Sequence, residues 1–76
     1  NFVKRYKKYD LSIKYYTEVL SKLDPTSIIY ADVLFRRGGS YERIGNEQKA
    51  DEDLLKSLEI KPDEPHVLNY LAYSWL

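Results

Sequence analysis

A histidine beside two acids near the C-terminal end is the arrangement most able to do chemistry. His66 follows Asp63 and Glu64, and an imidazole next to carboxylates can serve as an acid–base pair or a metal ligand. A metal or catalytic site needs further groups, yet the chain has one His and no Cys. Acids just before Pro65 also suit the start of a helix. We therefore expect His66 to have no catalytic or metal-binding role.

The remaining short motifs are explained without chemistry. Asp51, Glu52 and Asp53 are consecutive, so on a helix they point in different directions and cannot converge on a cation. Gly38 and Gly39 lack the spacing of a phosphate-binding loop, and no nucleophile motif occurs. The absence of Cys excludes disulfides and thiolate chemistry. We expect no catalysis and no cofactor.

A pattern of large, small and aromatic residues gives the elements that surround these groups. It occurs twice, 34 positions apart, at Leu34, Gly38 and Tyr41 and again at Leu68, Ala72 and Trp75. Steps of four and three place each set on one helix face. Between the two sets lie Ala50, Leu54, Ser57 and Pro62. Small residues allow close helix approach, and a period of this length is typical of stacked antiparallel helix pairs.

On these positions the sequence resembles the tetratricopeptide repeat (TPR) family. The resemblance implies an all-α, antiparallel helix-pair array, a fragment of an α-solenoid. Residues 31–64 align as a complete repeat, and residues 65–76 align as the first helix of the next one. Residues 1–30 align as the second half of a preceding repeat plus a lengthened connection. The chain is thus expected to be a piece of a longer protein, and its last helix is similar to repeats of bacterial TPR proteins.

Punctuating residues and the repeat alignment predict the helix limits. We expect helices over residues 2–6, 9–23, 47–60 and from 65 onward, with Gly45 in a left-handed turn. The connection containing Pro25 has four extra residues, which we expect to lengthen a helix capped by Asp24 or Thr26 and ending at Ile44. On the outer face of helix 47–60 we expect two ion pairs, Lys49–Asp53 and Glu52–Lys56.

Arg37 departs from the family pattern, because it stands where the family usually has Leu. Two outcomes are open at this position. Either the junction between helices is partly polar, or the arginine lays its aliphatic stem along apolar surface and keeps its charge in water.

The charges are segregated although their sum is zero. Residues 1–22 carry six Lys or Arg against two acids, a balance of +4, and residues 44–64 carry seven acids against three Lys, a balance of −4. Solvated outer helix faces explain this arrangement. Complementary ends for a partner or a second copy are the alternative. The basic run at residues 4–9 resembles a nucleic-acid patch, but no further positive field supports it, so we do not expect nucleic-acid binding.

Binding is the function that the resemblance implies: a protein–protein interaction scaffold or adaptor that takes a peptide or protein in a concave groove. The alternative is a non-catalytic appendage of an enzyme whose active site lies elsewhere. Cations and aromatics in the groove suit a partner with an acidic or aromatic anchor. The groove positions of the family correspond to Lys4, Arg5, Asp32, Phe35, Arg36, Gly39, Glu42, Arg43, His66, Asn69, Tyr70 and Tyr73.

Apolar end faces predict association of the fragment with itself. The last helix lacks the neighbour that would cover Leu68, Leu71 and Trp75. Exposed faces of this kind favour self-association. The sequence has no run of 18 apolar residues, so we expect no membrane span. It leaves the compartment open between the cytoplasm and a bacterial periplasm or envelope.

Overall fold

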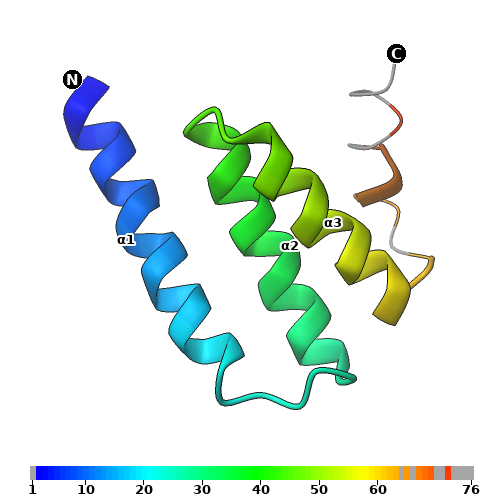
Figure 1. Cartoon of the computed structure of the whole chain (residues 1–76). Coiled ribbons are helices and arrows are strands. Elements are labelled where there is room, and N and C mark those ends of the chain that lie inside the picture. Colours follow the sequence, from blue (N-terminus) through cyan, green and yellow to red (C-terminus); the bar gives the residue numbers. More distant parts are fainter. Residues whose placement is uncertain (1, 64, 66, 70–71, 73–76) are drawn as a thin grey trace.

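Three α-helices make up most of the part of the chain that the structure describes. The computed structural model describes residues 2–63, 65, 67–69 and 72, with side chains from residue 7 onward. The helices are α1 (Phe2–Leu20), α2 (Ile28–Arg43) and α3 (Glu47–Ile60). Figure 1 shows α2 in the middle, with α1 and α3 on opposite sides of it. The predicted all-α antiparallel array is confirmed.

Helix α1 is continuous, so the expected break between residues 6 and 9 is wrong. No Gly or Pro occurs from Phe2 to Leu20, and Lys7 and Lys8, which bridge the two predicted helices, are good helix formers. The helix also ends at Leu20 rather than Leu23. Beyond it the chain continues in turns, with the Lys22 amide donating to the Val19 carbonyl at 3.0 Å.

The extra residues of the connection lie in a loop and do not lengthen α2. Ser27, rather than Asp24 or Thr26, is the N-cap of α2, since its side chain accepts from the Tyr30 amide at 3.1 Å. Asp24 instead orders the loop by accepting from the Thr26 amide at 2.9 Å and the Thr26 hydroxyl at 2.7 Å. These hydrogen bonds, the one from the backbone foremost, lower the pKa of Asp24 below its ordinary value.

The turn between α2 and α3 follows the expected chemistry. Gly45 has φ +84°, a left-handed conformation that glycine adopts without steric cost. Asn46 then caps α3 by accepting from the Lys49 amide at 3.3 Å. The predicted helix from Glu47 to Ile60 is confirmed.

The core lies between α2 and α3, at the close approach that Gly38 permits. A Cβ atom on Gly38 would meet Leu54 Cγ at 3.0 Å and the Ala50 carbonyl oxygen at 3.3 Å. Leu34, Ala50 and Leu54 are buried. Burial of such apolar surface is the main stabilising term of a small domain.

The far end of the same helix pair is held by a polar contact and by apolar packing. Ser57 is buried and donates its hydroxyl to the Ala31 carbonyl at 3.0 Å. After α3 the chain returns so that Val67, fully buried, packs with Leu54, and Phe35 and Leu58 cover this cluster. The repeat positions at 31, 34, 38, 50, 54 and 57 are thus interior positions.

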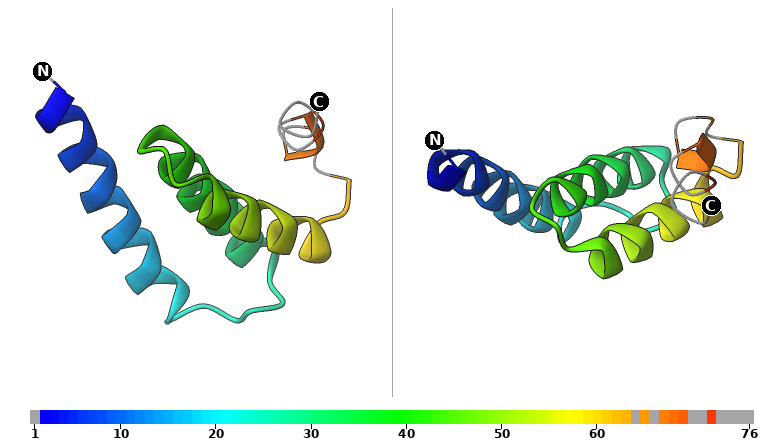
Figure 2. Two further views of the ribbon diagram at one scale, coloured as in Figure 1. Left: turned by 45° about the horizontal axis from the view of Figure 1, so that its top comes forward. Right: turned by 90° about the horizontal axis from the view of Figure 1, so that it is seen from above.

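The molecule is a thin slab. Its principal extents are 36 × 35 × 16 Å, and the two views of Figure 2 show the helices side by side with little depth. The smallest dimension of the molecule is therefore less than half of either of the other two.

Candidate interaction surface

Helix α2 presents three faces, of which one is open to solvent. At about 100° per residue, Ala31, Leu34 and Gly38 face α3. Arg37 projects toward α1 and Tyr41 lies beside it. The third face carries Asp32, Arg36, Gly39, Glu42 and Arg43, all of which are exposed. We call this set the α2 outer face.

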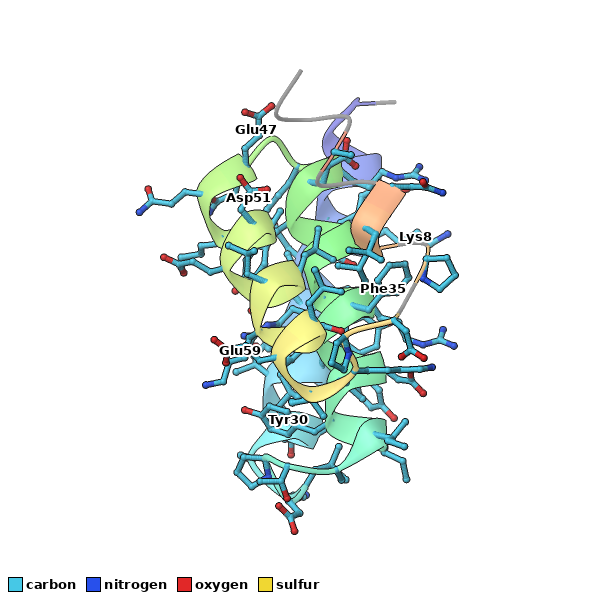
Figure 3. All side chains as sticks on the ribbon, turned by 90° about the vertical axis from the view of Figure 1, so that its right-hand side faces the viewer. Lys8, Tyr30, Phe35, Glu47, Asp51 and Glu59 are labelled. Carbon is cyan, nitrogen blue, oxygen red and sulfur yellow. The ribbon has the colours of Figure 1, made fainter. Side chains whose placement is uncertain are left out.

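The structure gives the predicted groove residues three different outcomes. The five residues of the α2 outer face and Asn69 are exposed as expected. Phe35 is half-buried against the Leu54–Val67 cluster, and Figure 3 shows its ring on the side of α2 nearest the chain after α3. Lys4 and Arg5 belong to α1, but their side chains lie outside the described part. His66, Tyr70 and Tyr73 also lie outside the described residues.

The charges of the α2 outer face alternate in sign. Arg43 pairs weakly with its neighbour Glu42, with Nε and Oε2 3.8 Å apart. Arg36 makes no ion pair or hydrogen bond with any other residue that the structure describes. Its guanidinium therefore keeps its donors available for a carboxylate from outside.

Gly39 leaves a bare place on this face. Unlike Gly38, a Cβ at Gly39 would meet nothing within 4 Å among the described residues, so packing among those residues does not require glycine there. Glycine inside a helix costs roughly 0.5–1 kcal/mol relative to alanine. Arg36 and Arg43 lie one helical turn away on either side, so the position without a side chain at Gly39 lies between two cationic side chains.

A second polar centre, absent from the predicted site, lies where the three helices meet. The Arg37 guanidinium donates from Nε to Asp53 Oδ2 and from Nη2 to Asp53 Oδ1, both at 2.7 Å. Its remaining nitrogen, Nη1, donates to Thr17 Oγ1 on α1 at 3.2 Å. The hydrogen bonds to Asp53 raise the pKa of Arg37 further above its ordinary value. Of the two outcomes left open for Arg37, the polar junction is confirmed.

The expected ion pair Lys49–Asp53 on the outer face of α3 is wrong. The Asp53 side chain is only 8% exposed, because Asp53 follows Ala50 by three residues and shares its inward face. Lys49 instead places its Nζ 5.6 Å from the centre of the Tyr41 ring, and Arg37 approaches the same ring to 5.7 Å. Both are cation–π contacts.

The described residues contain neither a metal-ligand cluster nor a helix able to span a membrane. They contain no cluster of three or more His, Cys, Asp or Glu that could hold a metal ion. One carboxylate oxygen, Oδ1 of Asp51, is buried without a hydrogen-bond partner in the described part; Figure 3 places Asp51 on the first turns of α3. In the same part of the chain, no helix combines the length and apolar character of a transmembrane segment.

The packing of the helices indicates the class of protein. Antiparallel helices that stack side by side, with small residues at each close approach, form a helical repeat array. Residues 31–64 match the family model described as tetratricopeptide repeat. This segment is thus a tetratricopeptide repeat, which indicates a protein–protein interaction module. Searches of curated proteins and of solved structures found no match.

Proposed function

We propose that the chain is a scaffold or adaptor module that binds a peptide or protein segment across the α2 outer face and has no catalysis of its own. In this proposal, residues 1–30 are the second half of one repeat with a lengthened connection. Residues 31–64 are the complete repeat, and residues 65–76 are the first helix of the next.

Two neighbouring features of α2 support the proposal: Gly39, which has no side chain, and Arg36, whose guanidinium is unpaired within the described residues. No described residue would lie within 4 Å of a Cβ at Gly39, so packing against those residues does not offset the cost of glycine to helix stability. A partner backbone can approach α2 more closely at this point than at any position with a side chain. Arg36, one turn away and unpaired within the described residues, then meets an acidic side chain of the partner.

Peptides selected from a random display library against the immobilised chain test this proposal. We expect them to be enriched in Asp and Glu. Arg36→Glu should weaken binding of a selected peptide by about tenfold or more, because a charge-assisted hydrogen bond contributes about 1.5–3 kcal/mol. Lys56→Glu, which reverses an exposed charge on α3, is the matched control and should change the affinity little. Fluorescence anisotropy with a labelled peptide measures both.

Gly39→Ala is the second arm of the test. It should weaken the same peptide without lowering the melting temperature, since the added methyl group enters open space. Selected peptides that bind the parent, Arg36→Glu and Gly39→Ala with equal affinity would show that the partner uses another face.

A further inference from the structure

Arg37 lies on α2, and its guanidinium donates hydrogen bonds both to α3 and to α1. Both oxygens of Asp53 on α3 accept from it at 2.7 Å, and Thr17 on α1 accepts at 3.2 Å. The ring of Tyr41 lies 5.7 Å from its central carbon. Only 20% of the Arg37 side chain is exposed, so the planar group is held in one orientation.

That orientation matters most for α1. Helix α1 packs mainly on α2 and contacts α3 only weakly, and Leu20 near its C-terminal end is buried. Apolar contact is non-directional, and it allows a helix to slide or tilt on its neighbour at small cost. A hydrogen bond from a fixed donor has no such freedom. A slide of α1 by one helical turn, about 5.4 Å, would carry Thr17 out of reach of Nη1.

We infer that Arg37 is a register lock: Asp53 orients its guanidinium, and the guanidinium sets the position of α1 on the α2–α3 pair through Thr17. Stabilisation is not what the ion pair chiefly supplies. Removing two charges from water costs about as much as their attraction returns, so an apolar pair of similar volume serves stability equally well. A buried polar group can instead choose one packing among several of similar energy, which is the role assigned here.

The proposed experiment measures the position of α1 and the stability of the fold separately. The chain has no Cys, so Lys14→Cys on α1 and Glu52→Cys on α3, both exposed, accept spin labels. Pulsed electron–electron double resonance then gives the distribution of distances between the spin label on α1 and the spin label on α3. Circular dichroism gives the helix content and the melting temperature of the same samples.

Two variants are expected to release α1. Thr17→Val keeps the shape of the side chain and removes the acceptor. Arg37→Leu with Asp53→Leu replaces the whole lock by apolar side chains. We expect a broader or shifted distance distribution in both, with unchanged helix content, and no fall in the melting temperature of the double variant.

Ser12→Ala is the matched control. The Ser12 hydroxyl donates to the Lys8 carbonyl at 3.1 Å within α1, as Thr17 donates to the Ile13 carbonyl at 2.7 Å. The control thus removes the same kind of intrahelical bond and should leave the distances unchanged. A Thr17→Val distribution that superimposes on those of the parent and Ser12→Ala would overturn the inference. That arm decides the question even if the double variant fails to fold.

Discussion

Two adjacent glycines in α2 should respond in opposite ways to the same substitution. At either position, alanine gains about 0.5–1 kcal/mol from helix propensity. At Gly38 the new Cβ meets Leu54 Cγ at 3.0 Å and the Ala50 carbonyl at 3.3 Å. Leu54 is 2% exposed and the carbonyl belongs to the α3 backbone, so neither can retreat freely. Such overpacking costs roughly 1–3 kcal/mol.

The net expectation is a loss of about 1 kcal/mol for Gly38→Ala and a gain of about 0.5–1 kcal/mol for Gly39→Ala. For a domain of this size, 1 kcal/mol shifts the melting temperature by about 4–8 °C. Thermal unfolding followed by circular dichroism at the helix band measures both variants under one condition. Gly38→Leu should lower the melting temperature further. If Gly38→Ala raises it as much as Gly39→Ala does, the close approach of α2 and α3 at this position is refuted.

Three further predictions address the junction, the loop and the ends of the array. Arg37→Leu alone should lower the free energy of unfolding, measured in urea, by roughly 3–5 kcal/mol, because it leaves the buried carboxylate of Asp53 without a partner. The double variant Arg37→Leu with Asp53→Leu should lower it little. A single variant as stable as the parent would contradict the pairing. Asp24 has a pKa below its ordinary value, so its contribution to stability is present above the unfolded pKa and disappears as the pH falls through the lowered value. Asp24→Ala should therefore lower the melting temperature at neutral pH and leave it unchanged below that lowered value; an equal effect at both pH values would argue against the linkage. The isolated chain should self-associate at high concentration, because Tyr15 and Leu68 are 64% and 48% exposed, and sedimentation showing a strict monomer would rule this out.

Local signals in the sequence were sufficient for the limits of α3. The turn at Gly45 and the breaker at Pro62 bound α3, and both act through backbone geometry within a few residues. The expected break in α1 came from the repeat alignment rather than from a residue that interrupts a helix. Propensity alone, with no Gly or Pro before Leu20, indicates one continuous helix.

Contacts between distant residues account for what was missed. Asp53 was assigned to a neighbour four residues away, whereas its partner Arg37 lies sixteen residues away on another helix. The spacing of Asp53 between the small inward residues Ala50 and Ser57 was the available signal, since all three share one face. Phe35 is half-buried for a similar reason: the chain after α3 returns and brings Val67 to it.

The thinness of the slab has a consequence for how the chain tolerates change. With an extent of 16 Å in its smallest dimension, the fold has most of its buried residues between α2 and α3. Helix α1 and helix α3 pack chiefly on α2, so exposed substitutions on α1 and α3 that lie away from Arg37 share few neighbours. Their effects on the free energy of unfolding should add within about 0.5 kcal/mol. Such a chain can vary one edge while the other keeps its structure.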